Sequence, residues 1–359
     1  MCCSNVQTQS EFGYAHAETY MTHPCHYGQR VHRDDGENGV EEDACKFVDL
    51  FCGMGGASTG AASLGYKIHL AVDSCERALS VHEMNHPGAL HVCMRLPPPP
   101  SVGTEALPLP ASGERWHCHG SPPCTALSIV RTTACTTGQR NEGLALVRWY
   151  LDFALTTHAT TWSMEQVPTP PVMRVLHEYR ARYGPRRIAF AVVDFATLGV
   201  PQTRVRVLAG TPKLIQRIQC MHCARRSVLS VIKTPRGTHI RSEKLYEGRP
   251  RKYATKRRKC GKHENCRSVH GLCYTVVAYK PLRWATPTLD RPLIRLTVEE
   301  TAALQTFSPH CFKHHTASVA NVQLGNAIPP LVMRHMMSSL YDASQTPMSP
   351  SLRRMHTPV

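Results

Sequence analysis

The chain has 359 residues, of which 42% are apolar and 7% aromatic, and it carries a formal net charge of +16. This length allows a large buried core, in one large domain or two smaller ones. No apolar stretch reaches the roughly 20 residues of a transmembrane helix, and the first residues lack an apolar secretory core, so we expect an intracellular protein with no membrane partner. Its 16 cysteines, without a secretory signal, indicate a reducing compartment and free thiols.

The positive charge is concentrated in one segment. Between Thr211 and Ala285 there are 19 lysines and arginines against three acidic residues, whereas the rest of the chain has 23 residues of each sign. A localised positive region of this kind is typical of proteins that bind a polyanion. We therefore expect a nucleic acid as a partner.

The N-terminal part of the chain begins with a polar stretch and continues with a glycine-rich turn. Residues 1–44 show no hydrophobic periodicity, which predicts a disordered N-terminal arm. A short apolar run at 46–51 predicts a buried strand, and a helix over 57–64 follows it. The turn between them contains Gly53, Gly55 and Gly56. Glycines at the start of a helix let a ligand approach the backbone amides closely, so this turn is a candidate ligand site.

An acidic residue ends the second predicted strand. This strand, at 67–72, runs into Asp73, and a helix is expected over 75–85. In nucleotide-binding α/β units an acid at this place accepts hydrogen bonds from ribose hydroxyls. The Pro-rich residues 97–114 then predict a flexible insertion.

A cysteine follows two prolines in Gly120-Ser-Pro-Pro-Cys124, directly after a strand expected at 115–119. Proline fixes its own backbone and restricts the residue before it, so this thiol is expected to be held stiffly at a strand end. A further strand, at 160–164, places Glu165 at its own end. The thiol and the carboxyl group are therefore both expected at strand ends.

Strands and helices alternate up to residue 211. The remaining elements expected there are helices over 142–158 and 172–183 and strands at 187–195 and 204–209. Such alternation predicts an α/β fold, a mostly parallel, Rossmann-like sheet with helices on both faces. In the last strand Arg204 and Arg206 are two residues apart, so both are expected on one face.

The rest of the chain divides into a basic region and a return to the sheet. We expect a catalytic and cofactor-binding domain over 45–210, a basic region over 211–285, a return to the catalytic domain over 286–343, and a disordered tail over 344–359. Basic runs lie at 249–252 and 256–259. Cysteines that could bind a tetrahedral zinc are Cys220, Cys223, Cys260 and Cys266. The second half of this set lacks a paired spacing, so we expect no metal.

Five of these segments occur in a fixed order that resembles the cytosine-5 DNA methyltransferase family, over residues 46–340. They are Phe47-Val-Asp-Leu-Phe-Cys-Gly-Met-Gly-Gly56, Gly120-Ser-Pro-Pro-Cys124, Met164-Glu-Gln-Val-Pro168, Gly199-Val-Pro-Gln-Thr-Arg-Val-Arg206 and Gln323-Leu-Gly-Asn-Ala-Ile-Pro-Pro330. Because a single motif is weak evidence, the shared order carries the resemblance.

The resemblance implies a function and a set of site residues. It implies transfer of a methyl group from S-adenosyl-L-methionine to carbon 5 of a cytosine flipped out of duplex DNA. The implied catalytic residues are Cys124 as nucleophile, Glu165 as the acid at ring nitrogen 3, and Arg204 and Arg206, which steady the glutamate and the base. The implied cofactor-binding residues are Phe51, Gly53, Gly55, Gly56, Asp73, Ser74, Pro123, Asn326 and Ala327, and the implied substrate-binding residues are Ser128 and Gln202. The basic region would recognise the target sequence.

The sequence departs from the family at three places. Thr125 stands where the family commonly has Gln, Gln166 stands for Asn, and no acid occurs near Cys93. Two alternatives therefore stay open: an RNA (tRNA) cytosine-5 methyltransferase, and a catalytically impaired relative that only binds nucleic acid. The nucleus or a site of DNA replication is compatible with the sequence, which names no protein partner.

Overall fold

The computed structural model describes residues 44–128, 136–233, 235–242, 266–286, 293–308, 311, 316–338 and 340. These residues belong to one compact unit, Asn38–Val359. The predicted N-terminal arm apart from its last residue, the basic runs at 249–252 and 256–259, Cys260 and the tail over 344–359 lie outside the described residues.

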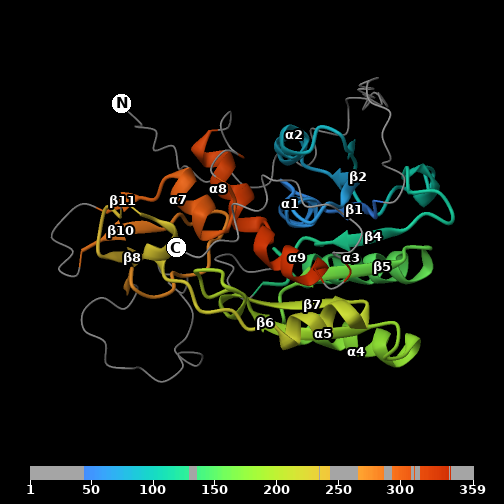
Figure 1. Ribbon diagram of the computed structural model, residues 1–359. Helices are drawn as coiled ribbons and strands as arrows, with labels where there is room; N and C mark the ends of the chain where they lie inside the picture. The colour runs from blue at the N-terminus through green and yellow to red at the C-terminus, as the bar shows by residue number, and fades with distance from the viewer. Residues whose placement is uncertain are drawn as a thin grey trace, which may run out of the picture. The chain divides into compact units, whose positions relative to one another are not determined.

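A seven-stranded sheet forms the centre of the fold (Figure 1), with the strand order β3-β2-β1-β4-β5-β7-β6. Its strands are β1 (Lys46–Leu50), β2 (Lys67–Asp73), β3 (Leu90–Cys93), β4 (Trp116–Gly120), β5 (Thr161–Gln166), β6 (Ala189–Asp194) and β7 (Val205–Gly210). Strands β3, β2, β1, β4 and β5 run parallel to one another, whereas β7 is antiparallel to both β5 and β6. The prediction of a mostly parallel sheet is confirmed.

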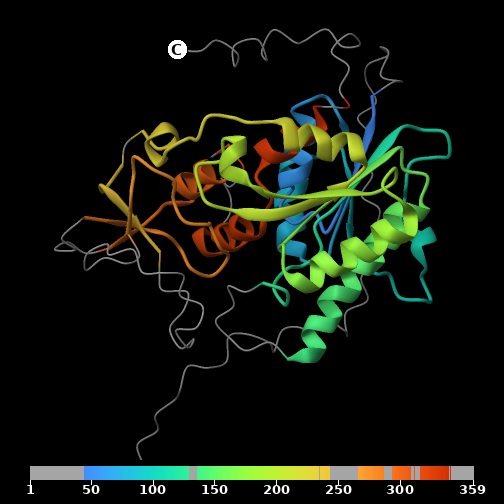
Figure 2. The ribbon, with the colours of Figure 1, turned by 90° about the horizontal axis from the view of Figure 1, so that it is seen from below.

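Helices cover both faces of this sheet (Figure 2). They are α1 (Gly56–Ala62), α2 (Glu76–Asn85), α3 (Thr137–Thr156), α4 (Pro170–Tyr183), α5 (Pro212–Cys220) and α9 (Pro330–Met337). Apolar residues of α3 and α4 share one core cluster with the sheet, and those of α1, α5 and α9 share another. Because side chains alternate along a strand, β1 contributes Val48 to the first cluster and Phe47 to the second. The predicted Rossmann-like α/β fold is confirmed.

The insertion expected to be flexible is packed on the sheet domain instead. Leu107 in this segment is only 3% exposed and belongs to the core on the α3 side. His69 Nε2 lies 3.0 Å from the carbonyl oxygen of Pro108. The prolines thus shape a segment that buries apolar surface, which composition alone did not reveal.

A second, antiparallel sheet is built from the basic region and the segment after it, with the strand order β11-β10-β8-β9. Its strands are β8 (His239–Arg241), β9 (Cys266–Ser268), β10 (Arg283–Ala285) and β11 (Ile294–Arg295), and the helices near it are α6 (Val228–Val231), α7 (Val298–Leu304) and α8 (Ala317–Asn326). Ile240 and Trp284 are buried in its core. Helix α5, the start of the basic region, instead packs on the large sheet.

Two glycines of helix α1 let the segment 323–330, here called the closing segment, pack against that helix. A Cβ atom on Gly56 would lie 2.1 Å from the carbonyl oxygen of Ile328, and one on Gly60 would lie 2.4 Å from that of Pro330. Only glycine permits so close an approach. Among the helices that the structure describes, none is long and apolar enough to cross a membrane.

Candidate active site

The central parallel strands bring their carboxyl ends to one edge of the sheet. Because β4 lies between β1 and β5, the turn after Leu50, the loop after Gly120 and Glu165 are neighbours. In open α/β sheets ligands bind outside the carboxyl ends of the strands. Segments that are far apart in the sequence therefore meet where a ligand is expected.

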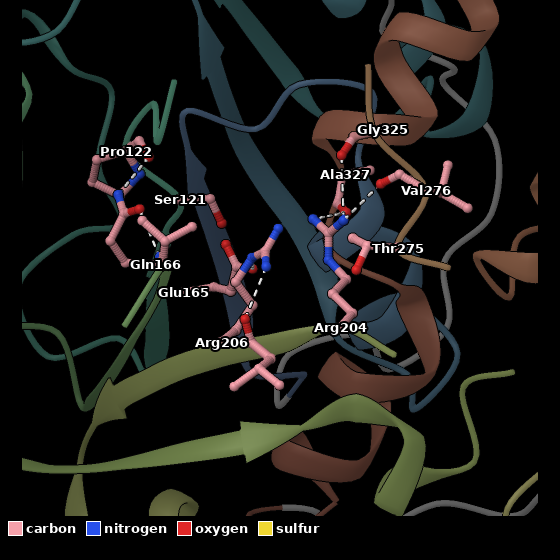
Figure 3. Close-up of polar contacts among 12 residues, drawn as sticks. Ser121, Pro122, Glu165, Gln166, Arg204, Arg206, Thr275, Val276, Gly325 and Ala327 are labelled. Carbon is pink, nitrogen blue, oxygen red and sulfur yellow. Dashed lines mark hydrogen bonds and ion pairs between the residues drawn. The ribbon is translucent and has the colours of Figure 1, made fainter. Parts of the chain in front are cut away.

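A buried ion pair joins Glu165 to Arg206 (Figure 3). Arg206 Nε lies 2.9 Å from Glu165 Oε1, and the two side chains are only 14% and 8% exposed. The antiparallel pairing of β5 with β7 places the two residues on adjacent strands. No hydrogen bond of good geometry reaches Glu165 Oε1 from the described residues, so the arginine charge is the main compensation for burying this carboxylate.

The Cys124 thiol is half-buried, and its environment contains charges of both signs. Burial raises the pKa of this thiol, and the Glu165 carboxylate raises it too, whereas Arg206 and, to a smaller extent, Arg204 oppose the shift. Together these effects raise the pKa of the Cys124 thiol. The arginines are therefore the groups that favour a reactive thiolate here.

Gln166 ties the cysteine loop to β5. Its side chain is fully buried, and its Nε2 donates to the carbonyl oxygen of Pro122 at 2.9 Å. Its Oε1 accepts from the backbone N–H of Val167 at 2.8 Å. The sequence marked this residue only as a departure from the family; the structure gives the longer amide a definite role in holding the loop.

Arg204 is directed away from Glu165 (Figure 3). Its guanidinium is buried and donates to the carbonyl oxygens of Val276 at 3.2 Å, Gly325 at 3.3 Å and Ala327 at 3.1 Å. We expected both arginines to point at the reacting groups. The structure brings Arg206 to Glu165, while Arg204 joins the segment before β10 to the closing segment.

Gln202 also makes contacts within the protein. It is fully buried, donates to the carbonyl oxygen of Leu304 at 2.9 Å, and accepts from the backbone N–H of Val276 at 3.0 Å. Ser128 is the last described residue of the cysteine loop, and its backbone N–H donates to the Cys124 carbonyl oxygen at 2.9 Å. The Ser128 position thus lies one helical turn from the thiol, whereas Gln202 lies inside the fold.

The expected cofactor residues surround the turn after β1. Phe51, Gly53 and Gly55 have positive φ angles of 57°, 53° and 90°. Asp73 accepts from the backbone N–H of Gly53 and from that of Cys75, both at 2.8 Å, and burial raises the pKa of this carboxyl group. A Cβ atom on Gly53 would meet nothing within 4 Å. A carboxylate beside an open backbone turn fits a ligand that carries ribose hydroxyls.

The other expected cofactor residues lie around this turn and in the loops near it. Ser74 and Pro123 are exposed, and Asn326 and Ala327 end helix α8. Cys93 on β3 pairs with Asp73 on β2. The position where the family has a further acid therefore lies beside Asp73.

Three arginines form a row on the small sheet. Arg283 on β10 is paired with Arg241 on β8 and with Arg295 on β11. Like charges directly opposite one another across a sheet are unfavourable, and a bound polyanion would relieve that repulsion. Arg241 and Arg283 of this row belong to the basic segment that the sequence predicted, and Arg295 lies beyond it.

Histidine, cysteine and acidic side chains form no group of three able to hold a metal ion within the described ranges. Cys223 Sγ lies 3.7 Å from His335 Nε2, and Cys220 is exposed. Cys266 lies on β9.

Comparison with known proteins identifies relatives that are named type II methyltransferases. The chain is 26% identical over 313 residues to the type II methyltransferase M.HgiDI of Herpetosiphon aurantiacus, which spans 82% of this chain and 94% of that protein. It is 31% identical over 108 residues to M.HgiGI of the same organism, which spans 30% of this chain and 76% of that protein.

Solved structures share the fold. A prophage-encoded protein of E. coli described as a DNA modification methyltransferase aligns with a TM-score of 0.56 and 18% identity, over 83% of this chain and 99% of its own. The Dnmt2 methyltransferase of S. pombe aligns with a TM-score of 0.53 and 13% identity, over 82% and 97%. No protein-family model matches the chain. With five motifs in order and these relatives, the chain belongs to the S-adenosylmethionine-dependent cytosine-5 methyltransferase family.

Proposed function

We propose that this protein transfers a methyl group from S-adenosyl-L-methionine to carbon 5 of cytosine in DNA. The observation that carries the proposal is the meeting of Cys124 and Glu165 at adjacent strand ends, with Arg206 paired to the carboxylate at 2.9 Å. A nucleophile, an acid and a cation next to one another are what this reaction requires.

Carbon 5 of cytosine is a weak nucleophile until a thiolate adds at carbon 6. The Cys124 Sγ–C6 bond forms, and the ring electrons shift toward nitrogen 3, where Glu165 supplies a proton. Carbon 5 can then take the methyl group. A base such as water then takes the carbon 5 proton, the Sγ–C6 bond breaks to release the thiolate, and the Glu165 carboxylate takes back the proton from nitrogen 3, which restores the ring. Arg206 contributes by favouring the thiolate and by holding Glu165.

The cofactor supplies a methyl group on a positively charged sulfur. Asp73 would accept hydrogen bonds from its ribose hydroxyls, and the turn at Phe51, Gly53 and Gly55 would lie against it. The open space beside Gly53 supports this assignment. Because no acid stands at Cys93, the adenine amine would have to find its partner elsewhere.

DNA is the substrate that the relatives' names favour, and the arginine row supports a polyanion. A target base must be flipped out of the duplex, at a cost of a few kcal/mol. Phosphate contacts from Arg241, Arg283 and Arg295 would offset that cost. The same charges would attract tRNA, so the two nucleic acids must be tested side by side.

The proposal is tested by trapping the covalent step. Duplex DNA with 5-fluorocytosine at candidate target positions is incubated with the protein and the cofactor, because fluorine at carbon 5 cannot leave as a proton does. We expect a denaturation-resistant complex that maps to the Cys124 peptide and is absent in Cys124→Ala. Cys220→Ser, at an exposed cysteine of α5, serves as the control and should still be trapped. A complex at another cysteine, or none at all, would contradict the mechanism.

A further inference from the structure

A ladder of polar side chains leads up one face of β4 and β5 to the candidate site. In the parallel register His117 is paired with Thr161 and His119 with Ser163, and the last pair is Gly120 with Met164. Side chains two residues apart lie on the same face. The next residues on this face are therefore Ser121 and Glu165, at the same level of the sheet.

Hydrogen bonds connect this ladder without a break. The Thr161 hydroxyl lies 2.9 Å from His117 Nδ1, and His117 Nε2 lies 2.8 Å from the Ser163 hydroxyl. The same hydroxyl lies 2.8 Å from His119 Nδ1, and His119 Nε2 lies 2.9 Å from the Ser121 hydroxyl. The two imidazoles and Ser163 are fully buried. The chain thus runs inside the protein and ends in the loop that carries the cysteine.

The protons on this chain are coupled to one another. Burial lowers the pKa of both histidines, that of His119 to about 3, so each ring has one N–H and one acceptor nitrogen. If His119 donates to Ser121, its other nitrogen must accept from Ser163, and His117 must then donate to Ser163. In that arrangement every bond points toward the site, and the Ser121 hydroxyl keeps its own proton for a further acceptor.

A suitable acceptor lies at the same level. Glu165 Oε1 is buried and lacks a hydrogen bond of good geometry among the described residues. Figure 3 shows Ser121 beside Glu165, and in this structure no hydrogen bond yet joins the Ser121 hydroxyl to Glu165 Oε1. The charged and titratable groups around Glu165 are Arg206, which is paired with it, Arg204 and the Cys124 thiol. A buried carboxylate favours the polarity that offers it a donor.

The backbone around Ser121 is fixed, so this side chain is the adjustable part. The Ser121 N–H donates to the carbonyl oxygen of Leu50 at 3.2 Å. The ring of Tyr150 lies against Gly120, where a Cβ atom would be 2.2 Å away, and the Tyr150 hydroxyl donates to the Ser163 carbonyl oxygen at 2.7 Å. What His119 can still set is the direction of the Ser121 hydroxyl.

We propose that His119 and Ser121 are positioning residues of the candidate site: His119 donates to Ser121 and thereby aims the Ser121 hydroxyl at Glu165. This inference rests on the proposed function, since it assigns these residues a part in the chemistry of Glu165. A donor to a carboxyl group fixes its orientation, so Ser121 would hold Glu165 in place to face ring nitrogen 3.

The test is a double-mutant cycle on methyl transfer, with Ser121→Ala, His119→Gln and the double variant. We expect Ser121→Ala to lower the rate at saturating cofactor and DNA about tenfold, and to change the pH–rate profile. If His119 acts through Ser121, His119→Gln adds nothing to the rate loss in the Ser121→Ala background. His158→Gln, which alters an exposed histidine bonded to the Pro110 carbonyl oxygen, should leave rate and profile unchanged.

A second measurement does not depend on activity. The alkylation rate of Cys124 against pH, followed on its own peptide by mass spectrometry, should shift in Ser121→Ala because the charge next to the thiol is no longer held in place. Independent rate losses for the two single variants, or an unchanged pH profile in Ser121→Ala, would overturn the inference. If the wild type does not methylate DNA but the alkylation profile shifts as expected, the proposed function fails and the positioning role stands.

Discussion

At the residue scale, the partner of Glu165 distinguishes the two arginines of one motif. Arg206 lies on β7 and Arg204 directly precedes it, yet only Arg206 is 2.9 Å from the carboxylate, while Arg204 bonds three carbonyl oxygens. The alternation of side chains along a strand predicts that the two arginines share a face. It could not predict that the closing segment, more than 100 residues later, supplies acceptors for one guanidinium, because that contact is made only in the folded chain.

Replacing Arg206 by Gln should make the thiol less acidic. The arginine is the largest charge that lowers the pKa of Cys124, so without it burial and Glu165 raise that pKa further. We expect alkylation of Cys124 at neutral pH to slow about tenfold, as for a shift of about one pH unit, and methyl transfer to fall at least as much. Arg148→Gln, which breaks an exposed ion pair with Glu178, is the matched control. An alkylation profile identical to that of the wild type would refute the electrostatic role.

Gln166 shows how a departure from a family pattern can be read only in the structure. Gln166→Leu would leave the carbonyl oxygen of Pro122 and the N–H of Val167 without their partner. Such a change costs about 1–3 kcal/mol, which denaturant unfolding can measure, and we expect methyl transfer to fall about tenfold because the cysteine loop is less firmly held. Gln216→Leu, at an exposed position of α5, should change neither quantity. Wild-type activity in Gln166→Leu would mean that the loop is held by other contacts.

At the element scale, the contact between α1 and the closing segment completes the sheet domain. The glycine turn was predictable as a turn from its position between a strand and a helix. Its second purpose was not, because the Ile328 carbonyl that requires Gly56 lies 272 positions further along the chain. Likewise the motifs located β4 and β5, whereas the reversed direction of β7 follows from a tertiary pairing with β6.

Gly56→Ala should therefore be strongly destabilising. Its Cβ would lie 2.1 Å from a backbone oxygen, and backbone cannot move aside as a flexible side chain can. We expect a loss of about 3 kcal/mol in the free energy of unfolding, together with weaker cofactor binding in calorimetry. Gly88→Ala, where a Cβ would meet nothing within 4 Å, should stay within about 0.5 kcal/mol of the wild type. Equal stabilities of the two variants would contradict this packing.

At the scale of the whole molecule, charge was the most predictable property. Its concentration between Thr211 and Ala285 predicts a polyanion-binding region, and Arg241 and Arg283 of the small sheet belong to that segment. The sequence could not show that β11, beyond that segment, adds Arg295 to the same row. It also did not reveal the buried histidines, because an alternating His-Cys-His strand reads equally well as half-exposed.

Those histidines should make the stability of the fold depend on pH. The pKa of His119 is about 3 in the folded protein, against 6.5 for a free histidine, so below pH 6.5 the unfolded chain takes up a proton that the folded chain does not. Stability from this group is present above pH 6.5 and is lost as pH falls toward 3. Between pH 7.5 and 5 we expect His119→Gln to lose roughly 2 kcal/mol less than the wild type, at about 1.4 kcal/mol per pH unit. A parallel decline of both proteins in denaturant unfolding would rule out this buried neutral ring.

A methyl-transfer assay shows whether the protein methylates DNA and whether Cys124 is needed. Tritiated S-adenosyl-L-methionine is offered with mixed-sequence duplex DNA and, separately, with tRNA, and the wild type is compared with Cys124→Ala. We expect tritium at carbon 5 of cytosine in DNA with the wild type, no tritium with Cys124→Ala, and equal DNA binding by both proteins. Label only in tRNA would contradict the assigned substrate. Salt-sensitive DNA binding with no label in either nucleic acid would contradict catalysis and leave a protein that only binds DNA.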